Sequence, residues 1–162
     1  MKASESARSL SLWLAVGLAF TTGAIGGALT PLGSWYEALQ KPAFQPPDWL
    51  FGPAWTLIFL LTAYAGHRVW EAGAKRSWVL SLFGLNALLN VLWSYLFFFS
   101  QRPDLAVFEA IALWFSIAAI VFVFRRRVPV IRWLLAPYLM WVAFAFVLNA
   151  AIVRLNGPFT GT

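Results

Sequence analysis

Long uncharged segments alternate with short charged ones along this chain. Four segments contain no Lys, Arg, Asp or Glu, and a fifth is interrupted only by Glu109. The segments are residues 9–36, 49–67, 77–101, 105–124 and 133–153. About 20 apolar residues in a helix cross the ~30 Å core of a membrane, and these segments lack the alternation of a membrane β-barrel. The pattern predicts an all-α integral membrane protein, a bundle of five transmembrane helices at about residues 10–29, 50–68, 78–99, 105–124 and 132–153 in one domain, 1–162.

Composition supports this interpretation and excludes other classes of protein. Hydrophobic residues make up 61% of the chain and charged residues 11%, against roughly 25% charged residues in an average soluble domain. A soluble protein of 162 residues cannot bury so much apolar surface, so soluble enzymes, disordered regulators and nucleic-acid binders fit poorly. The chain has no cysteine and His67 is its single histidine, which excludes disulfides and Cys- or His-rich metal sites. We therefore expect no metal and no required cofactor.

The basic residues predict the orientation in the membrane. With the N-terminus in the cytoplasm, that side holds nine Lys and Arg residues and the opposite side three. Because positive charge concentrates in cytoplasmic loops, we expect the N-terminus inside, and the C-terminus and the 30–53 loop outside, in a bacterial cell membrane. The nine are Lys2, Arg8, Arg68, Lys75, Arg76, Arg125, Arg126, Arg127 and Arg132, and the three are Lys41, Arg102 and Arg154. The run of three arginines is interpreted as a topology anchor and a candidate contact for anionic lipid.

The 30–53 loop between the first two spans is unusual in composition. It contains five of the nine prolines, and proline lowers the entropy lost on ordering, so we expect the loop to have a defined shape. It also carries the aromatic residues Trp35, Tyr36, Phe44, Trp49 and Phe51. From composition alone these residues fit either an interfacial belt or a lid over a hydrophobic cavity at the mouth of the bundle.

Polar side chains inside the predicted spans have two possible roles each. Asn86, Asn90 and Trp93 are spaced so that they share one helix face, either as interhelical hydrogen-bonding groups or as ligand contacts. Glu109 is either a satisfied interface residue or a proton-linked group. His67, at the end of the second span, is interpreted as an interfacial polar residue rather than a haem ligand.

Gly23 and Gly27 form a G-x-x-x-G pattern in the first span. Such a pattern permits close helix approach, either inside the bundle or at a dimer interface. We favour internal packing.

Residues 35–55 read WYEALQKPAFQPPDWLFGPAW, and this stretch resembles the signature of the TspO/MBR family of tryptophan-rich sensory and translocator proteins. The matching positions are Trp35, Tyr36, Leu39, Lys41, Pro42, Pro46, Pro47, Trp49, Phe51, Pro53 and Trp55. Two later motifs agree, with Asn90, Trp93, Phe97 and Phe98 in the third span and Pro137, Tyr138, Leu139, Trp141, Ala145, Leu148 and Asn149 in the fifth. Asn86 stands where the family usually has glutamine, and Tyr95 where it has proline. The resemblance covers residues 10–156 and implies the same five-span fold, a loop that acts as a lid, and homodimers.

The resemblance also implies a site. Two stripes of side chains lie on the second and fifth spans, formed by Trp55 with Phe59 and by Trp141 with Ala145 and Leu148. Spacing alone would assign both stripes to packing. In the family, the corresponding tryptophans border a cavity for porphyrins, and aromatic faces suit a flat apolar macrocycle. The residues expected to line or cover the cavity are Trp35, Tyr36, Pro46, Trp49, Trp55, Phe59, Asn86, Asn90, Trp93, Trp141, Ala145 and Leu148. Lys41 is a candidate partner for porphyrin carboxylates.

Three functions are consistent with these observations. The first, which we favour, is a membrane receptor for tetrapyrroles such as protoporphyrin IX, acting in sensing, sequestration or transport under oxygen or light stress. The second is light-dependent porphyrin breakdown with Trp55 and Trp141 as oxidisable partners, since the sequence contains no dedicated catalytic set. The third is transport of a lipid, sterol or other small molecule, which five helices without an inverted repeat support only weakly. The expected partners are a tetrapyrrole or another flat hydrophobic molecule, membrane lipid and a second copy of the chain, and no nucleic acid.

Overall fold

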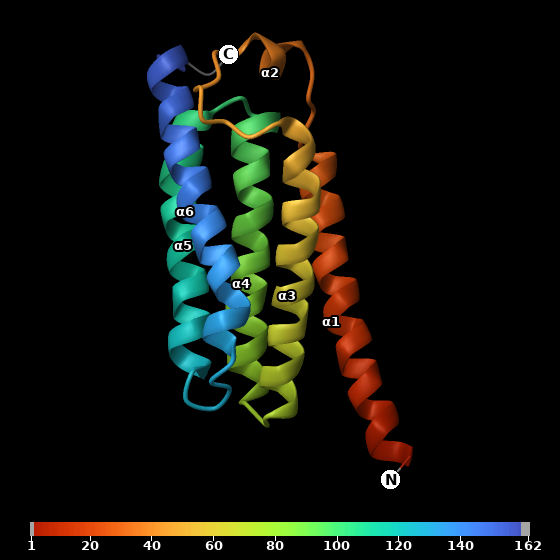
Figure 1. Cartoon of the computed structure of the whole chain (residues 1–162). Helices are drawn as coiled ribbons and strands as arrows, with labels where there is room; N and C mark the ends of the chain where they lie inside the picture. Colours follow the sequence, from red (N-terminus) through yellow and green to blue (C-terminus); the bar gives the residue numbers. More distant parts are fainter. Residues whose placement is uncertain (1, 160–162) are drawn as a thin grey trace.

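The computed structural model describes residues 2–159, and these residues form long helices with no β-strand among them (Figure 1). The long helices are α1 (Lys2–Ala28), α3 (Phe51–Glu71), α4 (Arg76–Ser94), α5 (Pro103–Phe124) and α6 (Ile131–Asn156). The segments long and apolar enough to cross a membrane are Ser9–Ala28, Asp48–Glu71, Arg76–Phe99, Pro103–Phe124 and Ile131–Asn156. The predicted five-helix membrane bundle is therefore confirmed.

The five long helices are arranged as a ring. Helix α1 packs against α3 and α4, α3 also packs against α6, α6 packs against α5, and α5 closes the ring against α4. Helix α1 is the most exposed of the spans and α5 the most buried. Figure 1 shows α1 leaning away from the other helices towards its N-terminal end. The interior of the bundle is consequently built mainly by the four helices α3 to α6.

The outer surface of the bundle is apolar, which is the reverse of a soluble protein. Trp13, Phe108 and Met140 are 69%, 72% and 73% exposed. The core is apolar too, with Ile117 and Leu135 fully buried. An apolar exterior over a helical bundle, whose backbone groups satisfy one another, is stable in contact with lipid. The chain is therefore an integral membrane protein.

Glycine permits the close approach of α1 to α3. A Cβ atom placed on Gly23 would lie 2.9 Å from the Cε2 atom of Phe59, closer than real Cβ contacts allow. A Cβ atom on Gly27 would meet nothing within 4 Å. Gly23 of the G-x-x-x-G pattern thus packs inside the bundle, and Gly27 faces open space.

The two ends of the bundle differ. One end, called the loop end here, is covered by the cap loop (residues 29–50), which contains the short helix α2 (Ser34–Ala38) and the 3₁₀ turn η1 (Asp48–Leu50). The C-terminal end of the described chain lies at this loop end too, and the N-terminus lies at the other (Figure 1). The other end, called the arginine-rich end here, carries the α3–α4 and α5–α6 connections. Because α3 begins at Phe51, residues 51–53 of the predicted loop are helical.

Candidate functional site

A small cavity lies beneath the cap loop. Its volume is about 40 Å³, and its walls come from the cap loop, the start of α3, the end of α4 with the adjoining turn, and α6. The lining residues are Tyr36, Gln45, Phe51, Trp93, Phe97, Phe98, Ala145, Leu148, Asn149 and Ile152. Four of the predicted site residues line it, namely Tyr36, Trp93, Ala145 and Leu148.

A π-helical turn, η2 (Tyr95–Phe99), shapes the wall at the end of α4. The N–H of Ser100 donates to the carbonyl of Tyr95 at 2.8 Å, five residues back, so the turn is wider than an α-helical one. Phe97 is buried and stacks on Trp93 with ring centroids 5.2 Å apart, and Phe98 lies 5.5 Å from the Tyr36 ring. The wide turn thus brings two successive phenylalanines to the same cavity.

Trp55, Phe59 and Trp141 gather in a second aromatic cluster beside the cavity. Trp55 stacks on Phe59 at 5.5 Å between ring centroids and meets Trp141 edge-on at 6.4 Å. Phe51, which lines the cavity, lies 5.7 Å from Trp141 and connects the two groups. These predicted site residues therefore lie one aromatic layer away from the cavity lining.

Asn86 and Asn90 form hydrogen bonds between helices. The Nδ2 atom of Asn86 donates to the hydroxyl of Ser116 at 2.9 Å, and that of Asn90 donates to the hydroxyl of Tyr138 at 3.0 Å. Both asparagines are buried. Their amide groups join α4 to α5 and to α6, which is the interhelical role considered in the sequence.

The remaining predicted residues belong to the outer part of the site. Trp35 packs edge-on against Phe97 with centroids 6.2 Å apart, so it covers the cavity wall. Pro46 is half-buried in the cap loop, and Trp49 is 72% exposed on η1. An exposed tryptophan at the end of a span matches the interfacial role of tryptophan in membranes.

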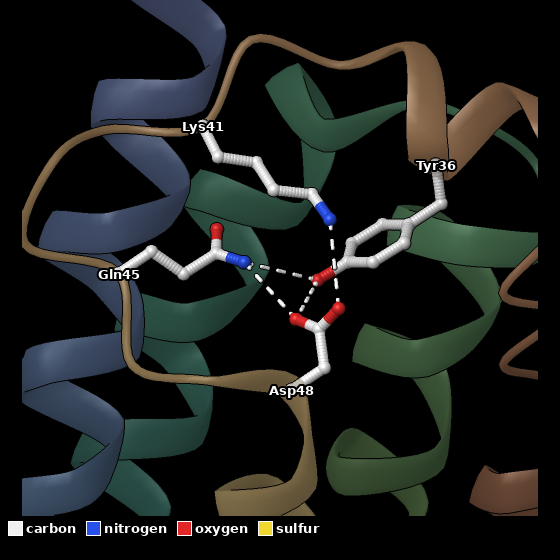
Figure 2. A network of polar contacts seen from close by, with 4 residues as sticks. All are labelled: Tyr36, Lys41, Gln45 and Asp48. Atoms are coloured by element: carbon white, nitrogen blue, oxygen red, sulfur yellow. Dashed lines mark hydrogen bonds and ion pairs between the residues drawn. The ribbon is translucent and has the colours of Figure 1, made fainter.

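A polar network holds the cap loop in shape (Figure 2). The Tyr36 hydroxyl donates to Oδ1 of Asp48 at 3.0 Å, and Nε2 of Gln45 donates to both of these groups at 3.2 Å. Nζ of Lys41 lies 3.6 Å from Oδ2 of Asp48 and 4.0 Å from the centre of the Tyr36 ring. Burial and the hydrogen bond to Asp48 raise the pKa of Tyr36 to about 12, so its phenol remains a donor at neutral pH.

A second contact fastens the cap loop to the bundle. Oδ1 of Asn156, at the end of α6, accepts from the Gln40 N–H at 2.7 Å, and its Nδ2 donates to the Gln40 carbonyl at 2.9 Å. These two bonds give hydrogen-bond partners to both backbone groups of Gln40, its N–H and its carbonyl, as pairing with a β-strand would. The loop is thus a folded cap with fixed contacts.

Two polar atoms of the cavity lining have no partner among the described residues. They are Oε1 of Gln45, an acceptor, and Nε1 of Trp93, a donor, and both are buried. A buried polar atom without a hydrogen bond costs about 1–3 kcal/mol, so such atoms favour a binding partner. The cavity therefore offers one acceptor and one donor to a ligand.

Sequence reasoning missed part of the lining. Phe51, Phe97, Phe98 and Asn149 stand at positions of the quoted motifs, so a signal for them was present. Gln45 and Ile152 gave no signal, as their role depends on how the cap loop lies on α6.

Comparisons with known proteins agree with this architecture. The sequence profile of the TspO/MBR family matches residues 15–155. The chain is 39% identical over 152 residues to the tryptophan-rich protein TspO of Chlorobaculum tepidum, covering 91% of this chain and 96% of that protein. It is 33% identical over 130 residues to the tryptophan-rich sensory protein of Cereibacter sphaeroides, covering 80% and 82%. It is 32% identical over 131 residues to the human translocator protein, covering 78% of each. The chain therefore belongs to the TspO/MBR family.

Proposed function

We propose that this protein binds a tetrapyrrole such as protoporphyrin IX, or another flat hydrophobic molecule, beneath the cap loop. Its role would be sensing, sequestration or transport under oxygen or light stress. The names of two relatives, a tryptophan-rich sensory protein and a translocator protein, support a role of this kind. No dedicated catalytic residue enters the proposal.

The character of the cavity lining carries the proposal. Half of its lining residues are aromatic, and the two unpaired atoms, Gln45 Oε1 and Trp93 Nε1, border the same space. A flat apolar macrocycle is best held by aromatic faces, with a few polar groups fixing its orientation. A free-base porphyrin supplies pyrrole N–H donors for the acceptor and carboxylate acceptors for the donor.

Binding requires the cap loop to move. The cavity measures about 40 Å³, whereas small-molecule sites are roughly 300–1,000 Å³. The contacts that would separate are those of Asp48 with Tyr36 and those of Asn156 with Gln40. Lys41, once released from Asp48, would be free to meet a ligand carboxylate. The arrangement with these contacts intact is then the closed form of the site.

A titration with protoporphyrin IX tests this function. We would follow tryptophan fluorescence of the detergent-solubilised protein, corrected for inner-filter absorption, in wild type, Ala145→Phe and Ala143→Phe. Ala145 lines the cavity and Ala143 lies exposed on the same helix, so the second variant controls for an added ring. We expect saturable quenching in wild type and Ala143→Phe, and an affinity at least about tenfold weaker in Ala145→Phe. Linear quenching that is equal in all three would mean that the porphyrin only enters the micelle, which contradicts the proposal.

Light-dependent porphyrin breakdown, with molecular oxygen as the oxidant, is a second candidate. The observation that favours it is the contact path from Phe51 in the cavity wall to Trp141 and on to Trp55, with ring centroids 5.7 and 6.4 Å apart. Indoles in such contact can be oxidised by an excited porphyrin. Product formation that needs light and stops in Trp141→Phe, while binding persists, would support this activity. Equal product formation in Trp141→Phe and wild type would show that Trp141 takes no part in porphyrin breakdown.

We also propose that the arginine-rich end faces the cytoplasm of a bacterial cell, because positive charge favours that side. The chain has no cysteine, so single cysteines report orientation cleanly. A membrane-impermeant maleimide applied to intact cells should label Ala43→Cys in the cap loop and leave Ser77→Cys unlabelled. The reverse pattern would invert the orientation. The homodimer implied by the family resemblance stays a prediction.

A further inference from the structure

A second and larger cavity opens at the arginine-rich end of the bundle. Its volume is about 520 Å³, within the range of roughly 300–1,000 Å³ that is typical of small-molecule sites. It lies between the C-terminal turn of α3 and the connection from α5 to α6. The lining residues that matter here are Arg68, Glu71, Arg127, Val128, Pro129 and Val130.

Two guanidinium groups form the polar wall of this cavity. Arg68 donates from Nη1 to the hydroxyl of Tyr64 at 3.2 Å, and Arg127 donates from Nη1 to the carbonyl of Gly73 at 2.6 Å. Each bond orients its exposed arginine and uses only one of the five N–H groups of a guanidinium. Neither arginine forms an ion pair with a carboxylate among the described residues. Positive charge thus lies at the cavity without a counterion from the described part of the protein.

The carboxylate of Glu71 is engaged with α1. Its Oε1 atom accepts from the hydroxyl of Ser11 at 3.1 Å. Residues 68–76 and 125–132, which make up the two connections and their flanks, contain seven Lys and Arg residues and one acidic residue. The local field therefore attracts anions.

The remaining wall is apolar and lies at the membrane boundary. Val128 is buried, and Pro129 and Val130 complete this side of the cavity. The membrane-spanning segments end next to it, at Glu71 and Phe124, and the next one begins at Ile131. Trp133 is 70% exposed on the first turn of α6, where an interfacial tryptophan is expected. An occupant would meet positive charge on one side and apolar surface on the other.

We propose that this cavity binds the phosphodiester headgroup of a membrane phospholipid, with Arg68 and Arg127 as the phosphate ligands. Guanidinium groups match phosphate oxygens in charge and in geometry. The apolar wall and the position at the end of three spans favour a lipid over a soluble phosphate, because the acyl chains can continue along the exposed apolar helices. This site is separate from the cavity under the cap loop, and it does not depend on the function proposed for that cavity.

Native mass spectrometry of the detergent-solubilised protein tests the proposal. The probes are phosphatidylglycerol, inorganic phosphate and glycerol 3-phosphate. In the test variant, Arg68→Gln with Arg127→Gln removes both phosphate ligands. The control, Arg125→Gln with Arg126→Gln, removes the same charge from the same end of the bundle but outside the lining. We expect one tightly retained phosphatidylglycerol in wild type and in the control, and retention at least about tenfold weaker in the test variant.

A third variant separates loss of charge from loss of the cavity. Val130→Trp keeps every arginine and fills the apolar side, so it should weaken retention as well. Thermal unfolding of each variant shows whether its fold is intact. If Arg127→Gln disturbs the α5–α6 connection, the lipid retention of Val130→Trp tests the site instead. Equal retention of phosphatidylglycerol in wild type, in the test variant and in Val130→Trp would overturn the site. Equal loss in test and control variants would reduce it to unspecific attraction, and displacement of the lipid by glycerol 3-phosphate or phosphate at equal concentration would overturn the choice of a lipid.

Discussion

The charged groups at the two ends of the bundle differ in whether they have partners. At the loop end, Asp48 accepts a hydrogen bond from Tyr36 and pairs with Lys41, and the cavity measures about 40 Å³. At the arginine-rich end, Arg68 and Arg127 have no carboxylate partner among the described residues, and the cavity measures about 520 Å³. Polar groups that satisfy one another can close a structure, whereas unpaired like charges repel and need an outside partner. This difference supports the two proposals, an apolar ligand at the first end and an anionic headgroup at the second.

Removing an aromatic side chain from the loop end should have the largest effect. Phe97 is 3% exposed and contacts Trp35 and Trp93 as well as the cavity. Phe97→Ala should lower the free energy of unfolding by about 3 kcal/mol, because it leaves a cavity that the rigid neighbours cannot fill. Phe99→Ala, on the same turn but 59% exposed, should cost less than about 1 kcal/mol. Thermal unfolding in detergent, followed by tryptophan fluorescence, measures the stability of both variants. Equal losses of stability would mean that the loop end is not tightly packed.

Opening the cap loop should have the next largest effect. Asp48→Ala removes the acceptor of the network in Figure 2 and should cost the closed loop about 2 kcal/mol, or roughly 30-fold in the opening equilibrium. Hydrogen exchange of cap-loop amides should speed up accordingly, while amides at the arginine-rich end keep their rates. Glu37→Ala is the matched control, since the Glu37 carboxylate lies exposed in the same loop. If the two variants exchange alike, Asp48 does not hold the loop closed.

The hydrophobic pattern was sufficient to predict the fold. Apolar segments of this length are stable in lipid as helices, and all five form helices. Part of the cavity lining also agreed with what the family resemblance implied, as with Ala145 and Leu148 on α6. The rest depends on tertiary geometry. Trp93 and Phe97 stack as expected of residues four apart, but the π-helical turn rotates the residues after it, and its single extra residue leaves no periodic signal.

Polar partners were harder to predict than helices. Asn86 and Asn90 share one face, which spacing showed, yet only the packed structure reveals that Ser116 and Tyr138 accept their amide hydrogen bonds. The clamp between Asn156 and Gln40 joins residues more than a hundred positions apart, and neither stands in a recognisable motif. The large cavity at the arginine-rich end likewise requires α3 and the α5–α6 connection to meet. The periodicity of a sequence describes one helix or strand at a time. These contacts form between two elements, so periodicity does not predict them.

Glu109, inside the α5 span, allows a further test of how much polar pairing matters in the bundle. It is 7% exposed, and neither carboxyl oxygen has a partner among the described residues. Glu109→Leu should raise the free energy of unfolding by about 1–2 kcal/mol, because it removes unsatisfied polar atoms from an apolar interior. Asn86→Leu should lower it by a similar amount, because it leaves Ser116 without its donor. Thermal unfolding compares the two, and a loss of stability in Glu109→Leu would show that the carboxyl group has a partner in the membrane.

The smallest of these effects should come from raising the pH by one unit, from 10 to 11, which loosens the cap loop. Burial, together with the hydrogen bond to Asp48, raises the pKa of Tyr36 from 10.0 to about 12. Between these values the closed loop holds a proton that an opened loop has lost, so its stability falls as pH rises, by about 1 kcal/mol between pH 10 and 11. Below pH 10 the stabilisation is fully present, and above about pH 12 it is gone. Phenolate absorbance should show a transition near pH 12 that disappears in Tyr36→Phe, and cap-loop proteolysis should accelerate over the same range only when Tyr36 is present. If the cap loop of Tyr36→Phe opens at the same pH, another group causes the alkaline transition, and the Tyr36 proton does not stabilise the loop end.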